Sequence, residues 1–75
     1  MEIYKNLSGD SGVHAFQIGA DFIIVGFKKG GTYRYSYRSA GRRNIEQMKT
    51  LARRGQGLGT FINRYVKKEY ERKIR

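Results

Sequence analysis

Cysteine is absent from the chain, and histidine occurs once, at His14. Without thiols, neither a disulfide framework nor a thiolate zinc site can stabilise the fold. The six carboxylates are scattered, and no group of them has the spacing of a metal site or of a paired-carboxylate hydrolase. The sequence therefore predicts a protein that is not an enzyme and that has neither a metal ion nor a cofactor.

Long apolar segments are also missing. The longest run, residues 22–25, has the length of a β-strand and not of a membrane span. The amino terminus lacks the basic segment, apolar stretch and cleavage site of a signal peptide. We therefore expect a soluble, cytoplasmic protein, and a monomer because its charge opposes self-association.

Acidic residues are few compared with basic ones. Sixteen Lys and Arg stand against six Asp and Glu, which gives a formal net charge of +10. Residues 1–27 hold one base and three acids, whereas residues 28–75 hold fifteen bases and three acids. Small soluble domains usually keep a net charge of about 2 to 8. The excess predicts a polyanionic partner, whose binding would relieve the repulsion among the cations.

Three segments have the composition of β-strands: residues 13–18, 22–28 and 32–38. The turn signals Gly19-Ala20-Asp21 and Lys29-Gly30-Gly31 separate them. Each connection is short enough for a hairpin. The sequence therefore predicts a three-stranded antiparallel meander.

A helix is predicted between Asn44, which can cap it together with Gln47, and Gly55, which ends it. Lys49 and Arg53 are expected on its solvated side. The apolar stripe consists of Ile45, Met48, Leu51 and Ala52.

A second helix is predicted from Thr60, with Glu69 interrupting its apolar stripe so that burial stops soon after Val66. The tail of residues 68–75 is expected to fray or to become ordered on binding. The stripe consists of Phe61, Ile62, Tyr65 and Val66. The predicted fold is α+β, a single domain over residues 1–75 in the order βββαα, with both helices on one sheet face and residues 1–10 and 70–75 loose.

The register of the second hairpin decides the role of the tyrosines at positions 33, 35 and 37. A three-residue turn at 29–31 places them in the core and leaves Arg34 and Arg38 on a polar strip. A two-residue turn would place them opposite Ile24 and Phe22, as a stacking platform for unpaired bases. We favour the core, because that register separates apolar from charged residues more cleanly. It pairs Phe27 with Tyr33, Val25 with Tyr35 and Ile23 with Tyr37.

A set of short motifs resembles the KTSC domain family over residues 11–70, nearly the whole chain. The resemblance implies RNA binding, which has been proposed for that family, and no catalytic residues. Residues 39–43 depart from the family, which has a proline and a hydrophobic position there, whereas this segment is basic and free of proline. The matching motifs are Val25-x-Phe27-x-x-Gly30-Gly31-x-Tyr33-x-Tyr35, Leu51-Ala52, Gly55, Phe61-Ile62-Asn63 and Tyr65.

The predicted function is non-catalytic binding of nucleic acid, RNA or single-stranded nucleic acid rather than duplex DNA, through phosphate contacts. The alternative is a small phage or bacterial interaction module that docks on an acidic protein or a nucleoprotein complex. The candidate binding residues are Lys28, Lys29, Arg34, Arg38, Arg42, Arg43, Arg53, Arg54, Arg64, Lys67 and Lys68.

Three other features have a weaker functional interpretation. The segment from Gly55 to Thr60, with glycines at 55, 57 and 59, either cradles a phosphate at a helix start or forms a tight turn, which we favour. His14 would be the base of a small ribonuclease, although a lone strand histidine is more often structural. The basic carboxy-terminal run would suit a membrane-surface helix, but its apolar residues are needed to cover the sheet.

Overall fold

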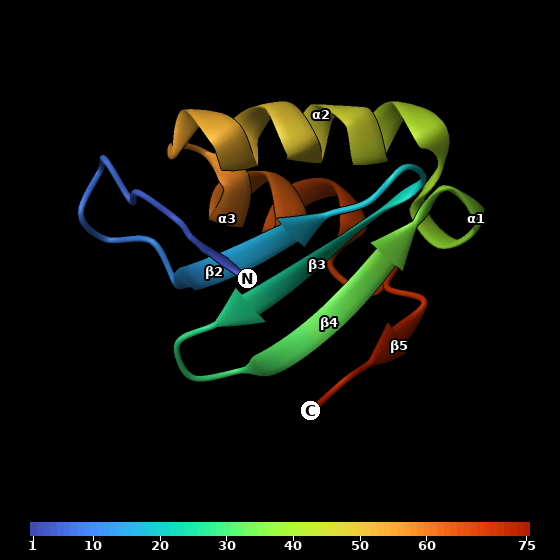
Figure 1. Cartoon of the computed structure of the whole chain (residues 1–75), viewed down its shortest axis with the longest axis horizontal. Coiled ribbons are helices and arrows are strands. Elements are labelled where there is room, and N and C mark those ends of the chain that lie inside the picture. The colour runs from blue at the N-terminus through green and yellow to red at the C-terminus, as the bar shows by residue number, and fades with distance from the viewer.

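Alternating apolar residues in three neighbouring strands give this chain a sheet with one buried face. The computed structural model describes residues 1–75. Its sheet is antiparallel with the strand order β1-β2-β3-β4-β5, and Figure 1 labels the last four of these strands. The central strands are β2 (Val13–Ile18), β3 (Phe22–Phe27) and β4 (Gly31–Ser36), and the edges are β1 (Glu2–Ile3) and β5 (Arg72–Lys73).

The helical segments follow the central strands and pack on the buried face of the sheet. They are α1 (Tyr37–Ala40), α2 (Arg42–Arg54), α3 (Leu58–Phe61) and the π-helical turn η1 (Ile62–Val66). The core between the layers contains Tyr4, Val13, Phe16, Ile23, Val25, Tyr35, Ile45, Met48, Leu51, Ala52, Leu58, Ile62 and Val66. None of the helices combines the length and the apolar character that crossing a bilayer requires.

The α+β class is confirmed, but the predicted layout βββαα is wrong. Two additional strands form the sheet edges, and α1 precedes the two expected helical segments. Each extra strand has two exposed residues, Glu2–Ile3 and Arg72–Lys73, so neither has the alternating pattern by which a strand is detected. The chain also returns to the sheet after its last helix, because β5 pairs with β4 (Figure 1).

The β3–β4 hairpin has a register two residues away from the predicted one. Its turn is Lys28–Gly30, so Val25 lies opposite Tyr33 and Ile23 opposite Tyr35. A shift of two residues keeps every side chain on its own face. Tyr35 is 2% exposed, which confirms the core interpretation for this tyrosine.

Tyr37 does not continue the strand, so its predicted pairing with Ile23 is wrong. The hydroxyl of Ser36 accepts a hydrogen bond from the Ser39 N–H, and the Ser39 hydroxyl accepts one from the Ser36 N–H. This reciprocal capping box begins α1 at Tyr37. Arg38 consequently lies on α1 and not on the polar strip of the sheet.

Helix α2 begins three residues earlier than predicted, since Gly41 and not Asn44 stands at its N-cap. The Asn44 side chain donates to the Ala40 carbonyl instead. The predicted stripe of residues 45–52 is buried, and Gly55 ends the helix in the left-handed region with φ 78°.

The second helical segment begins at Leu58, after Gly57, so the predicted cap at Thr60 is wrong. Its last turn is π-helical and therefore wider than an α-helical turn. The widened turn keeps Val66 in the core, but it leaves Tyr65 59% exposed, so the predicted burial of Tyr65 is wrong. Burial does stop after Val66, as the sequence predicts.

Lys49 was expected in solvent, yet it is 5% exposed. It stands four residues after the buried Ile45, which places it about 40° from Ile45 around the helix axis, on the same face. Its Nζ donates to the Ala20 carbonyl at 2.8 Å and pairs with the Glu46 carboxylate at 2.8 Å. The Tyr37 hydroxyl donates to the same carboxylate at 2.6 Å. This network joins α1 and α2 to the β2–β3 turn.

Gly55→Ala tests the requirement for glycine at the end of α2. A Cβ there would lie 2.6 Å from the Lys5 Cβ, on a residue with positive φ. We expect urea denaturation to show a loss of about 1 kcal/mol or more in the free energy of unfolding. Gly12→Ala is the control, because a Cβ there meets no atom within 4 Å. Equal stability of the two variants would contradict the packing.

Glu46→Gln tests the network around Lys49. The hydrogen bond from Lys49, and then that from Tyr37, lowers the pKa of the Glu46 carboxyl below its ordinary value of 4.5. Its stabilising contribution is therefore complete above that pH and is lost as the pH falls through the lowered pKa of the folded state. We expect the urea midpoint of the native chain to fall more between pH 6 and pH 3 than that of Glu46→Gln. Glu69→Gln, which removes an exposed carboxylate outside any ion pair, should retain the native pH dependence.

Candidate nucleic-acid interface

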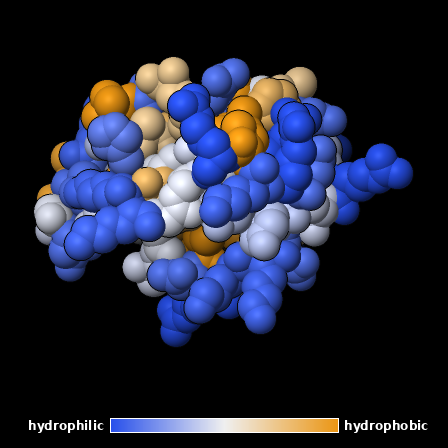
Figure 2. Space-filling model, turned by 90° about the horizontal axis from the view of Figure 1, so that it is seen from below, coloured by the Kyte–Doolittle hydropathy of each residue, from blue (hydrophilic) through white to orange (hydrophobic).

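The ion pairs divide the basic residues into two classes. Arg34 pairs with Glu71 and Lys49 with Glu46, and these are the ion pairs of the structure. Among the candidate binding residues, Arg34 alone has an acidic partner, and all the others are exposed. Figure 2, seen from the side of β4 and β5, shows a surface that is mainly hydrophilic, with apolar atoms in small separate areas.

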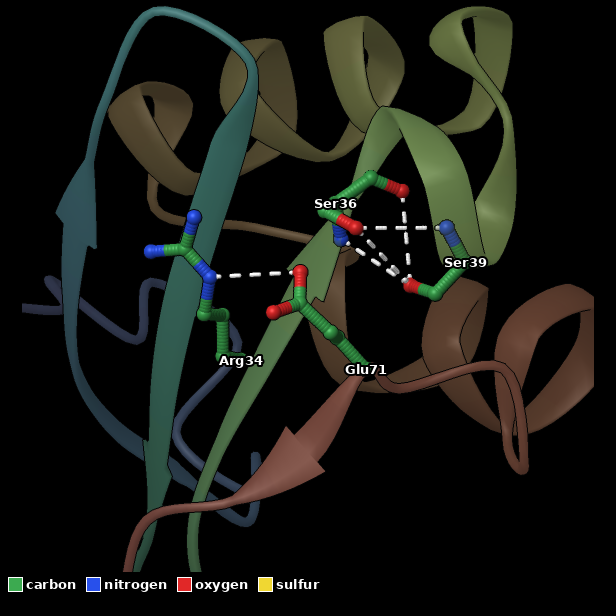
Figure 3. Close-up of polar contacts among 4 residues, drawn as sticks. All are labelled: Arg34, Ser36, Ser39 and Glu71. Carbon is green, nitrogen blue, oxygen red and sulfur yellow. Dashed lines mark hydrogen bonds and ion pairs between the residues drawn. The ribbon is translucent and has the colours of Figure 1, made fainter.

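Arg34 holds the carboxy-terminal tail to the sheet. Its Nε lies 3.3 Å from Glu71 Oε1 (Figure 3). Its guanidinium also lies 3.9 Å from the centroid of the Phe22 ring. The Glu71 N–H also donates to the Arg34 carbonyl at 2.6 Å. The Ser36 hydroxyl, and after it Arg34, lowers the pKa of the Glu71 carboxyl. Arg34 therefore has a partner within the molecule.

The tail returns to the turn between β3 and β4. Tyr33 lies opposite Lys73, and the Thr32 N–H donates to the Arg75 carbonyl at 2.7 Å. Lys67, which follows η1, lines a surface pocket together with Gly30 of the turn. Cations from three separate parts of the chain therefore meet at one end of the hairpin. We call this set the hairpin-end cluster: Lys28, Lys29, Lys67, Lys73 and Arg75.

Most of the other candidate residues lie on other elements of the fold. Arg38, Arg42 and Arg43 are at α1 and the start of α2. The far end of α2, with Arg53 and Arg54, is about 16 Å away along the helix axis, at a rise of about 1.5 Å per residue. Arg64 lies on η1, and Lys68 follows it. The predicted interface is thus several basic groups and not one continuous strip.

The sequence did not assign Lys73 and Arg75 to the interface. Their positions depend on β5, which has no sequence signal of its own. The one available hint is Tyr70, the aromatic residue of a tail in which all the others but Ile74 are charged. Its ring centroid lies 4.7 Å from that of Tyr33. An aromatic residue there indicates that the tail packs against the molecule.

The glycine-rich segment forms a tight turn, as we favoured. Gly55 and Gly57 have φ of 78° and 87°. A polar pocket of about 190 Å³ lies beside it and includes Asp10, whose carboxylate would repel a phosphate. The Leu58 N–H, at the helix start, already donates to the Tyr4 hydroxyl at 3.2 Å. These contacts do not favour a phosphate cradle.

Two weaker candidates of the sequence, His14 and the basic carboxy-terminal run, can be located in the structure. His14 is exposed on β2, and no three His, Cys, Asp or Glu side chains are grouped as a metal site would need. The basic run after Val66 is not helical, since it consists of a turn and β5. An amphipathic membrane-surface helix is therefore not formed by this segment.

Comparison with known proteins does not test the resemblance predicted from the sequence. The resemblance to the KTSC domain family rests on the sequence motifs alone and stays a prediction. No family model matches the chain, and neither a curated protein nor a solved structure matches it.

Proposed function

We propose that this chain is a non-catalytic binding protein for nucleic acid, with RNA or another single strand preferred over duplex DNA. The observation that carries the proposal is the scarcity of internal partners for its cations. The chain has sixteen Lys and Arg, and its ion pairs involve only Arg34 and Lys49. Cations that neutralise phosphates displace the counterions condensed on the nucleic acid, and the release of those ions drives association.

The spread of the cations favours a flexible strand over a stiff duplex. The molecule measures 31 × 23 × 22 Å, and basic groups lie at the hairpin end, at both ends of α2 and on η1. Duplex DNA has a persistence length of about 50 nm, so it can contact one side of so small a particle. A single strand can bend between the groups and neutralise more of them.

Paired substitutions test the mechanism and locate it. In a salt titration against single-stranded RNA, we expect log K to fall against log salt with a slope of about −0.7 per phosphate contact. Lys28→Ala/Lys29→Ala should reduce the slope and the affinity more than Arg53→Ala/Arg54→Ala, which removes the same charge outside the hairpin-end cluster. Binding that is insensitive to salt would contradict the electrostatic mechanism. Equal losses of affinity in the two variants would contradict the expectation that the hairpin-end cluster contributes most to binding.

Recovery of partners from a cell extract separates nucleic acid from an acidic protein. Material captured by the purified chain is treated with nuclease before elution. Loss of the captured partners supports nucleic acid as the ligand. Partners that remain after treatment, and that the Lys28→Ala/Lys29→Ala variant does not retain, indicate that the basic surface docks on an acidic protein instead.

A further inference from the structure

A surface pocket of about 270 Å³ opens beside the hairpin-end cluster. Its walls come from the β3–β4 hairpin, from η1 and from the carboxy-terminal tail, which β5 brings alongside β4. Pockets for drug-sized molecules usually measure about 300 to 1,000 Å³, so this one suits a smaller group. Its lining includes Phe27, Tyr33, Tyr35, Asn63, Lys67 and Tyr70.

The aromatic rings stand around the pocket and do not stack on one another. Tyr33 and Tyr70 are 4.7 Å apart between ring centroids and inclined at 56°. Tyr35 meets Tyr70 edge to face at 6.4 Å, and Phe27 meets Tyr33 in the same way at 6.0 Å. Tyr70 is 40% exposed. This arrangement offers aromatic surface to a flat guest that enters from solvent.

Tyr35 adds a polar group at the bottom of this aromatic wall. The residue is almost completely buried, and its hydroxyl makes no hydrogen bond within the protein. No fully enclosed side-chain oxygen of the structure lacks a partner, so this hydroxyl keeps an opening to solvent, and the pocket is the opening that Tyr35 lines. Burial, and then its neighbours Tyr33 and Tyr70, raises the pKa of Tyr35 to about 12. The hydroxyl is therefore neutral near pH 7 and can both donate and accept.

The charges at the rim indicate which guest the pocket prefers. Lys67 lines it, and the Nζ of Lys73 lies 5.8 Å from the centroid of the Tyr33 ring. Aromatic cages also bind quaternary ammonium groups, but Lys67 in the lining and Lys73 beside the Tyr33 ring would repel such a cation. A flat neutral ring that carries an anion next to it satisfies both the aromatic walls and the lysines.

We propose that this pocket receives one unpaired nucleobase, stacked on the exposed ring of Tyr70 with Tyr33 meeting it at an angle, and hydrogen-bonded by Tyr35 and Asn63, with the adjacent phosphates on the hairpin-end cluster. This inference rests on the proposed function. It states further that one base of the strand increases the affinity by binding in this pocket. The remaining basic groups contact the backbone alone.

The test uses three single strands of equal length: one fully abasic, one abasic except for a single central base, and one with all bases. Stacking is worth about 1 to 3 kcal/mol per base, so the single base should tighten binding about 5- to 150-fold over the abasic strand. Adding the other bases should bring little more, because there is one pocket. A gain that grows with every added base would overturn the proposal.

The variants locate the gain. Tyr70→Leu should abolish most of the difference between the abasic and single-base strands. Tyr35→Phe should reduce that difference about 2- to 10-fold, the effect of one hydrogen bond. Tyr65→Leu is the control, because Tyr65 is exposed on η1 and does not line the pocket. Tyr70→Leu could also detach β5 from the sheet. Asn63→Ala serves as a second variant, because it should reduce the difference between the two strands without altering the tail.

The outcomes separate the two proposals. Tight, salt-dependent binding of all three strands with equal affinity overturns the base pocket and leaves the proposed function standing. Equal loss in Tyr70→Leu and Tyr65→Leu also overturns the pocket. Failure of every strand to bind overturns both proposals.

Discussion

Contact between one sheet face and one helical layer holds this molecule together. Ile23, Val25 and Tyr35 on the sheet pack in the same cluster as Met48 of α2 and Leu58 of α3. The chain has no cysteine, and its net charge of +10 opposes compaction. Burial of these side chains is therefore the main force that stabilises the fold. The cations of α2 and η1 take their positions from this contact, because both elements contribute buried residues to it.

The sequence predicts those parts of the fold whose signal is local. The three central strands, the buried stripe of α2 and its end at Gly55 follow from alternation, helical spacing and left-handed glycine geometry. The edge strands β1 and β5 cannot be predicted in this way, because a strand of two residues is too short to show an alternating pattern. The hairpin turn lies one residue before the predicted one, at Lys28–Gly30 and not at Lys29-Gly30-Gly31. Both turns place the tyrosines on the same face of the sheet, so the apolar pattern cannot distinguish them. The sequence therefore predicts which face of the sheet each tyrosine occupies, but not which residue of β3 lies opposite it.

Lys49 and Tyr65 illustrate how side-chain type misleads. A lysine beside an apolar stripe is usually solvated, but this one reaches a backbone carbonyl and a carboxylate that other segments supply. A tyrosine in a helical stripe is usually covered, but here the last turn widens and directs it outward. For the candidate interface, composition predicts which residues are involved. Their grouping depends on the return of the tail, which Tyr70 and the Arg34–Glu71 pair stabilise.

The two outermost strands also affect how the molecules meet one another. A sheet edge offers free N–H and C=O groups to any neighbouring strand, and long, flat, apolar edges promote aggregation. Here each edge is two residues long, and three of those four residues are charged: Glu2 at one side and Arg72 and Lys73 at the other. Another copy of the chain would find few backbone groups to pair with, and at the β5 edge it would meet like charge. The tail that assembles the hairpin-end cluster thus also closes the sheet against further growth.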